Sequence, residues 1–136
     1  MSKVIGIDYG KKRIGIAISD IDQKIAFPLI TVENNKPIEV LKKIIESEKV
    51  ASIVVGVPIN LDGSNTDATE MCFKFHLRLK KEFPKINHFV EDERLTSKLA
   101  KRFLNHSDKK KQRGNKKNVD KISASIILEN FLIGLN

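Results

Sequence analysis

Cysteine is almost missing from this sequence, since Cys72 is the only one among 136 residues. A lone thiol excludes a disulfide within the chain and is typical of proteins in a reducing cytoplasm. Long apolar runs are missing too, because no stretch approaches the roughly 18 apolar residues that a membrane-spanning helix requires. The chain also begins without the pattern of a secretory signal peptide. We therefore expect a cytoplasmic protein that does not span a membrane.

Several familiar binding motifs are missing as well. The three histidines share no spacing that would suit a metal site. Gly10 and Gly15 have the spacing of a Walker A loop, but Ile16 and Ala17 stand where Lys and Ser or Thr are required. The same stretch resembles the phosphate loop of actin-like and sugar-kinase ATPases, but those proteins need two large lobes and a longer chain. We therefore expect no nucleotide-binding loop.

What is present suffices for one α/β domain over residues 1–136. Apolar residues make up 40% and charged residues 31% of the chain, as is usual for a soluble globular protein. Apolar alternation predicts strands, and helical periodicity predicts helices between and after them. The expected strands cover about 4–8, 14–18, 25–32, 52–57 and 86–90, and the expected helices about 37–45, 64–83, 96–104 and 119–132.

The segment Val4–Asp20 is the most informative part of the chain. It predicts two short apolar strands joined by a tight basic turn, and Asp8 interrupts the first strand near its end. Aspartate is depleted in strands and is costly to bury unpaired. Asp8 is therefore either a turn or capping carboxylate, or a ligand that holds a metal or a phosphate in a cleft.

Two further carboxylates could reach the same place. The carboxyl ends of parallel strands share one edge of a sheet, where ligands of open α/β sheets bind. If the first, fourth and fifth strands are parallel neighbours, Asp8 and Glu93 share that edge, and the last helix could bring Asp120 beneath it. Asp120 could instead occupy the first turn of that helix, where the dipole favours a carboxylate. Converging carboxylates would need a hard cation such as Mg²⁺ or Mn²⁺, which indicates a phosphodiester nuclease.

Positive charge is concentrated in one segment. The formal net charge is +8, and nine residues carry six of the positive charges. These six are Lys109, Lys110, Lys111, Arg113, Lys116 and Lys117. They lie in a polar stretch at about 106–118 that we expect to be a mobile loop. The segment is either an ordinary solvated loop or a surface for a polyanionic partner.

Four sequence blocks, in the order that the family has them, resemble the YqgF/RuvX family. They are GIDYGKKRIGIAISD, IVVGVPINLDGS, EDERLTS and NVDKISASIIL, and together they cover nearly the whole chain. The resemblance implies an RNase H-like fold related to the resolvase RuvC, with a five-stranded mixed sheet and helices on both faces. It also implies two-metal phosphodiester hydrolysis and the processing of the 5′ end of pre-16S rRNA.

The resemblance assigns roles to individual residues. Asp8, Glu93 and Asp120 match the family's acids and would be both the catalytic residues and the ligands of Mg²⁺ or Mn²⁺. Asp92 belongs to the same motif as Glu93 and could share the metal. RuvC-type enzymes place a fourth acid one helical turn after the last aspartate, where this chain has Ser123. We therefore expect a second ion to bind weakly.

Other motif residues are candidates for binding nucleic acid. Lys11 and Arg13 could contact phosphate beside the metal, or belong to an ordinary solvated hairpin. Asn60 and Ser64 could hold a phosphate at a helix N-terminus, or only shape the turn and cap the helix. Arg94 could reach the substrate or orient a neighbouring carboxylate.

Three functions remain open on the sequence. The first is a metal-dependent endonuclease that acts on structured RNA, the pre-rRNA of ribosome biogenesis. The second is a Holliday junction resolvase that acts on branched DNA, for which a two-fold dimer would be favoured. The third is a non-catalytic RNA-binding or transcription factor. We expect a monomer or a weak homodimer.

Overall fold

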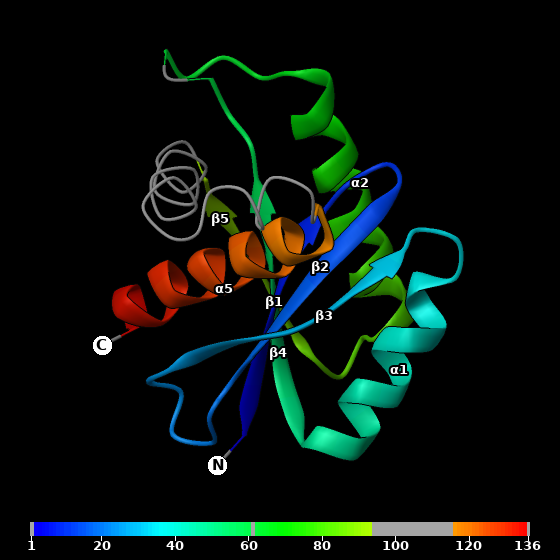
Figure 1. The fold of residues 1–136 in the computed structure, drawn as a ribbon, viewed down its shortest axis with the longest axis vertical. Coiled ribbons are helices and arrows are strands. Elements are labelled where there is room, and N and C mark those ends of the chain that lie inside the picture. Colours follow the sequence, from blue (N-terminus) through cyan, green and yellow to red (C-terminus); the bar gives the residue numbers. More distant parts are fainter. Residues whose placement is uncertain (1, 61, 94–115, 136) are drawn as a thin grey trace.

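The computed structural model of the protein describes residues 2–60, 62–93 and 116–135. Five strands in these ranges form one sheet with the order β3-β2-β1-β4-β5. β1 runs antiparallel to β2 and parallel to β4, and β4 runs parallel to β5, so the sheet is mixed as expected (Figure 1). The elements are, in chain order, β1 (Lys3–Tyr9), β2 (Arg13–Ser19), β3 (Ala26–Glu33), α1 (Pro37–Glu48), β4 (Val50–Val57), α2 (Asp67–Glu82), β5 (Asn87–Asp92) and α5 (Lys116–Leu135).

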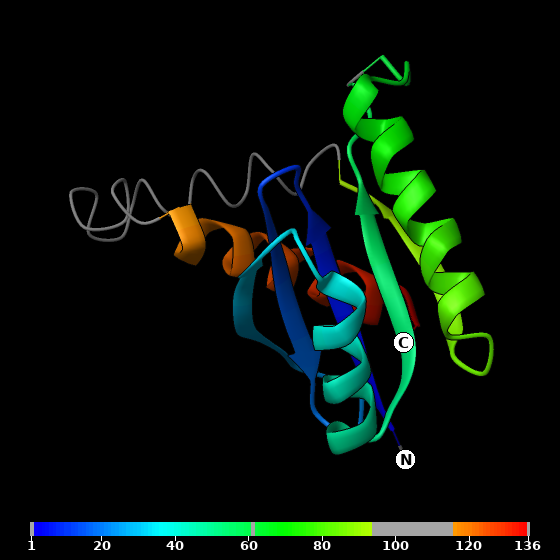
Figure 2. The ribbon, with the colours of Figure 1, turned by 90° about the vertical axis from the view of Figure 1, so that its right-hand side faces the viewer.

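Alternation along the strands divides the core into two layers. On one face, Ile5, Ile7 and Ile53 pack with Leu41 of α1 and Leu79 of α2. On the other face, smaller side chains pack against α5, and they are Val4, Ala17 and Val54. Helices therefore cover both faces of the sheet, α1 and α2 on one side and α5 on the other (Figure 2).

Pro28 lies in the edge strand β3, as its missing N–H predicts. The pairing of β2 with β3 shifts between Ile16↔Ile30 and Ala17↔Pro28, which leaves Leu29 as an extra residue. This irregularity is the edge or bulge that proline in a strand indicates.

Two expectations about helix starts were wrong. α2 is capped by Thr66 and not by Ser64, because the Thr66 side chain accepts from the N–H of Thr69 while the Thr69 side chain accepts from the N–H of Thr66. This reciprocal capping box satisfies two N–H groups at once, which one serine cannot do. α5 begins at Lys116, so 116–118 are helical and do not belong to the expected loop. Residues 106–115 of that loop, and the helix expected at 96–104, lie outside the described residues.

The earlier start of α5 also changes the explanation of Asp120. The first turn of the described helix contains no acidic residue, and Asp120 comes after it. A favourable interaction with the helix dipole is strongest in the first turn and does not account for this carboxylate. In the described part of the chain, no helix is long and apolar enough to cross a membrane.

Candidate active site at the carboxyl edge of the sheet

Asp8 is the second-to-last residue of β1 and lies on the face that α5 covers. It pairs with Gly15 of β2, and strand alternation puts it on the same side as Val4 and Gly6. A Cβ added at Gly6 would lie 2.6 Å from Cβ of Leu128 in α5. Asp8 is therefore directed toward the space between the sheet and this helix.

Glu93 reaches the same face from the other side of β1. It follows β5 directly, and its N–H donates to the carbonyl of Val57 at the end of β4, with 3.1 Å between N and O. The residue is buried, at 8% exposure. A Cβ added at Gly56 would lie 2.8 Å from Oε2 of Glu93, so the carboxylate occupies room that only glycine leaves over β4.

Asp120 approaches Asp8 from α5. The helix crosses β2 so closely at Gly15 that an added Cβ would collide with the main-chain oxygen of Asp120. Because Gly15 pairs with Asp8, this crossing brings the Asp120 segment next to Asp8. Arg13 at the start of β2 donates from Nε to Oδ2 of Asp120 over 2.8 Å, and both side chains of this ion pair are partly buried.

Asp8 interacts electrostatically with the two other carboxylates. Burial raises the pKa of Asp8 to about 7, and repulsion from Asp120 contributes to that rise. Burial likewise raises the pKa of Glu93 to about 8, with repulsion from Asp8 and then Asp92 adding to it. Asp8 thus interacts with both other acids, as expected for carboxylates that share one edge of the sheet.

The chemistry of the Asp8, Glu93 and Asp120 side chains suits a hard divalent cation. The three side chains offer only carboxylate oxygens, the ligands that Mg²⁺ and Mn²⁺ favour. Among the described residues, neither Asp8 nor Glu93 forms an ion pair with Lys or Arg. The described residues nevertheless contain no group of three His, Cys, Asp or Glu side chains already arranged to hold a metal ion. Asp120 interacts with Arg13 instead.

The loop after β4 is organised by its own side chains. Nδ2 of Asn60 donates to Oγ of Ser64 over 2.9 Å, and Oγ of Ser64 donates to Oδ1 of Asp62 over 2.6 Å. The N–H of Ser64 donates to the same Asp62 oxygen. Asn60 and Ser64 therefore shape this turn, one of the two roles left open for them.

The structure describes only some of the basic residues that are candidates for binding nucleic acid. Lys11 is exposed in the turn between β1 and β2, and Arg13 is held by Asp120. Lys116 and Lys117 belong to the first turn of α5, although their side chains are not among those described. The remaining candidates lie outside the described residues, and they are Arg94, Lys109, Lys110, Lys111 and Arg113.

A family model described as "RuvX: Holliday junction resolvase" matches residues 2–133. The chain belongs to the RuvX family. A relative from Amoebophilus asiaticus is 42% identical over 133 residues, which are 97% of this chain and 94% of that one. A relative from Flavobacterium psychrophilum is 40% identical over 133 residues, which are 97% of each chain. Both relatives carry the name "Putative pre-16S rRNA nuclease".

Solved structures agree with the fold of this RuvX-family chain. T. thermophilus RuvC in complex with a Holliday junction substrate matches with a TM-score of 0.58 and 13% identity, over 99% of this chain and 96% of that one. At this identity the likeness concerns the fold alone. It confirms the expected RNase H-like class.

Sequence reasoning missed three residues that build the site of this RuvX-family chain. Gly15 and Gly56 provide the space for the Asp120 segment and for the Glu93 carboxylate. Asn34 braces the turn that carries Lys11, because its Nδ2 donates to the carbonyl of Gly10 over 2.8 Å and its N–H to that of Lys12 over 2.9 Å. Glycine in a strand is a known signal for close approach, so Gly15 and Gly56 could have been found.

Proposed function

We propose that this RuvX-family chain is a metal-dependent endonuclease that hydrolyses phosphodiester bonds of pre-16S rRNA, in the processing of its 5′ end. The observation that carries the proposal is the presence of two buried carboxylates, Asp8 and Glu93, at the same edge of the sheet. Burial raises the pKa of both, with repulsion from Asp120 adding to the rise at Asp8 and repulsion from Asp8 adding to the rise at Glu93. Buried carboxylates with raised pKa values are concentrated at functional sites of proteins. The names of relatives at 40% and 42% identity support pre-16S rRNA as the substrate.

Each acid has a distinct part in this proposal. Mg²⁺ or Mn²⁺ held by Asp8, Glu93 and Asp120 would activate a water molecule and stabilise the leaving oxygen of the phosphodiester. Asp8 is the central ligand, since it interacts electrostatically with both Asp120 and Glu93. Asp120 can contribute its carboxylate once Arg13 moves to another anion, such as a substrate phosphate.

We also propose which residues bind the RNA backbone and in which compartment the protein acts. Lys11, Asn60, Ser64, Arg94 and the basic segment, defined as Lys109–Lys117, would contact the RNA backbone. Phosphate contacts of this kind position a substrate without reading its sequence. A reducing cytoplasm fits a chain whose single thiol, Cys72, is buried. We propose that the protein acts there as a monomer or weak homodimer.

The test is a cleavage assay on precursor 16S rRNA with purified protein. We expect cleavage with Mg²⁺ or Mn²⁺, poor cleavage with Ca²⁺, whose looser coordination tolerates unproductive geometry, and none in EDTA. Asp8→Asn should abolish cleavage while the protein stays folded, and Lys3→Gln, at the opposite end of β1, should leave it unchanged. Full activity in EDTA would refute the metal-dependent mechanism.

A second function is favoured by the description of the matching family model, which is a Holliday junction resolvase. The same assay therefore includes a synthetic four-way DNA junction beside the RNA. Cleavage of the junction into two nicked duplexes, with no cleavage of the RNA, would replace the first proposal by the second. Sedimentation of the protein with the junction would then show whether a dimer acts, as symmetric cleavage requires.

A further inference from the structure

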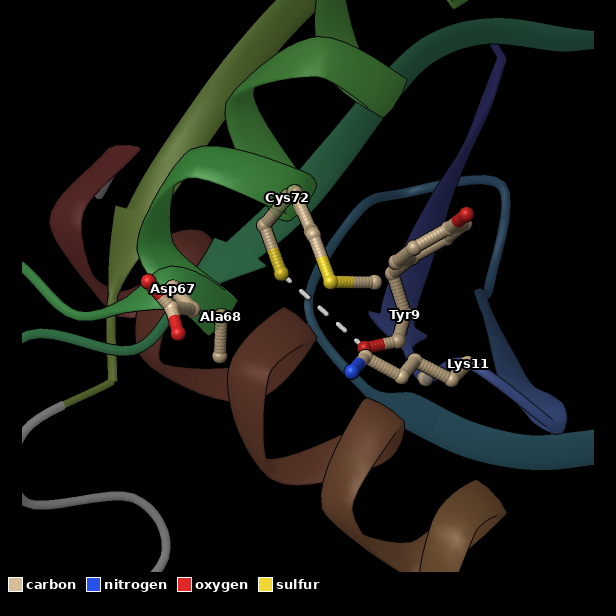
Figure 3. Close-up of a pocket in the computed structure, with 7 residues that line it drawn as sticks. Tyr9, Lys11, Asp67, Ala68 and Cys72 are labelled. Atoms are coloured by element: carbon tan, nitrogen blue, oxygen red, sulfur yellow. Dashed lines mark hydrogen bonds between the residues drawn. The ribbon is translucent and has the colours of Figure 1, made fainter.

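A hollow of about 370 Å³ opens between the β1–β2 turn and the first turns of α2. Figure 3 shows Tyr9 and Lys11 on one side of it, and Asp67, Ala68 and Cys72 from the helix on the other. Gly10 and Met71 complete its lining. Its size is at the lower end of the roughly 300–1,000 Å³ that is usual for small-molecule sites.

The walls of this hollow are held in place. The Tyr9 ring stacks on Phe75 of α2 with 4.3 Å between ring centroids and 29° between their planes. Sγ of Cys72, which is buried, lies 3.9 Å from the carbonyl oxygen of Tyr9. The capping box of Thr66 fixes the start of α2, from which Asp67 and Ala68 project. The hollow is thus a built feature of the fold.

The hollow adjoins the carboxylate site. Tyr9, Gly10 and Lys11 follow Asp8 directly in the chain. Burial raises the pKa of the Cys72 thiol to about 12, and repulsion from Glu93 and then Asp8 adds to the rise. The two carboxylates lie on the α5 face of the sheet and the hollow on the α2 face, so the two sites meet at the end of β1. A nucleotide held here would be a close neighbour of a phosphodiester at Asp8.

The lining excludes some ligands and favours others. Four of its lining residues, Tyr9, Ala68, Met71 and Cys72, have mainly apolar or soft side chains. The carboxylate of Asp67 would repel a phosphate, so the hollow is not a second phosphate site. A flat heterocycle suits such walls, because its faces are apolar while its edge carries groups for Lys11 and Asp67 to bind.

We propose that this hollow receives one unpaired nucleobase of the RNA, adjacent to the phosphodiester that is cleaved. The inference rests on the proposed nuclease function and adds to it a requirement on the substrate. Lys11 donates to a carbonyl or ring nitrogen of the base, and Asp67 accepts from an amino or imino group. A base can enter only when it is unstacked and unpaired, so cleavage is directed to bulges, loops and single strands.

The experiment measures binding and needs no turnover. Protein carrying Asp8→Asn, which prevents cleavage, is titrated in Ca²⁺ with two fluorescein-labelled RNA hairpins that share one sequence and a three-nucleotide bulge. In one hairpin the bulge has its bases, and in the other the bulge is abasic with the same phosphates. We expect the hairpin with bases to bind about 5- to 100-fold more tightly, the usual range for one base in a protein pocket.

Two substitutions in that background assign the effect to the hollow. Ala68→Leu fills it from the exposed first turn of α2 and should abolish the difference between the hairpins. Ala68→Ser keeps the volume and should retain the difference, and thermal melts confirm that both variants fold.

The outcomes separate this inference from the proposed function. Equal affinity for the two hairpins, or an undiminished difference in Ala68→Leu, overturns the nucleobase site and leaves RNA binding intact. Failure to bind either hairpin overturns the site together with the proposed RNA substrate.

Discussion

Carboxylates in this protein occupy two opposite electrostatic environments. Oδ1 of Asp20 accepts from the N–H groups of Lys24 and Ile25, each over 2.8 Å, and these bonds hold the pKa of Asp20 below its ordinary value. The pKa of Asp62 is lowered in the same way by Ser64. Burial instead raises the pKa of Asp8 and Glu93. Asp20 and Asp62 hold turns together, whereas Asp8 and Glu93 are costly to the fold when charged.

The raised values predict a pH dependence of stability without metal. Between about pH 4 and pH 8 the folded protein binds more protons at Asp8 and Glu93 than the unfolded chain does. The free energy of unfolding should therefore fall as pH rises through this window, and the loss should be absent below pH 4. At about 1.4 kcal/mol per pKa unit, Asp8→Asn should recover about 2–4 kcal/mol at pH 8. Urea unfolding in EDTA at pH 5 and pH 8 measures this.

Asp62→Asn provides the control for that experiment. Its carboxylate is stabilised by hydrogen bonds from Ser64, so neutralising it should not increase stability at pH 8. An Asp8→Asn protein that is less stable than the wild type at pH 8 in EDTA would show that Asp8 has a structural role instead.

The ion pair of Arg13 predicts an effect on metal binding. Arg13→Gln removes the cation from Asp120, which leaves Asp120 and Asp8 to repel each other. Without metal, the variant should lose about 1–2 kcal/mol of stability, since the pair is partly buried. With Mg²⁺ its melting temperature should rise more than that of the wild type, because Asp120 is then available as a ligand.

Lys3→Gln is the matched control, since it breaks the other described ion pair, Lys3–Glu48, which has the same 2.8 Å separation. It should leave the shift with Mg²⁺ unchanged. Equal shifts in Arg13→Gln, Lys3→Gln and the wild type would mean that Arg13 does not compete with the metal for Asp120.

At the scale of elements, the site depends on how closely α5 approaches the sheet. Three strands present a glycine beneath the helix or the Glu93 side chain: Gly6 in β1, Gly15 in β2 and Gly56 in β4. Side chains larger than hydrogen at these positions would lift α5 or displace Glu93. The carboxylates converge because glycine allows the layers to approach.

Gly15→Ala tests this close approach. The added Cβ would collide with the Asp120 backbone, so α5 must move, and overpacking of this kind costs about 1–3 kcal/mol. We expect lower stability and a smaller stabilisation by Mg²⁺. Gly134→Ala is the control. Gly134 lies in α5, and nothing lies within 4 Å of a Cβ added there. The Gly134→Ala protein should be as stable as the wild type or slightly more stable. If the Gly15→Ala protein were equally stable, α5 could not cross β2 closely at Gly15.

At the scale of the whole molecule, most of the net positive charge belongs to the basic segment, which we propose binds RNA. The net charge of +8 falls to +2 without the six positive charges of the basic segment, since 19 basic residues then stand against 17 acidic ones. Residues 109–115 of the segment directly precede α5, and Lys116 and Lys117 are the first two residues of that helix, which carries Asp120. It is thus connected to the carboxylate edge by a short piece of chain.

Replacing Lys109, Lys110, Lys111 and Arg113 by Gln should weaken RNA binding at low salt. Each phosphate contact that is lost should reduce the slope of log affinity against log salt by about 0.7 to 0.9. The loss should be similar for different RNA sequences, because phosphate contacts carry no base information. Binding is measured in the Asp8→Asn background over a range of salt concentrations.

A variant with four exposed lysines of α1 and α2 replaced by Gln has the same change in net charge. These are Lys42, Lys43, Lys80 and Lys81. It should keep most of the slope of the wild type. If the slope of log affinity against log salt falls equally in both variants, overall charge and not the basic segment determines the affinity for RNA.

The strands, their direction and the edge at which the acids gather follow from the order of residues along the chain. Apolar alternation is local, and a strand–helix–strand connection leaves little choice but parallel pairing. The chain order of the elements is therefore enough to assign Asp8 and Glu93 to one edge. The motif blocks likewise suffice to identify the family and its RNase H-like fold. These features depend on short stretches of chain or on their order.

What each side chain touches depends instead on the tertiary structure. Arg13 is 107 positions from Asp120, and no local pattern predicts that they pair. Ser64 has the chemistry of a helix cap, yet Asn65 forms an isolated β-bridge with Ile59 and Thr66 caps the helix. The raised pKa values of Asp8 and Glu93 arise from burial under a helix that joins the sheet from far along the chain. Contacts between distant segments depend on how the layers pack, and packing involves the whole chain at once.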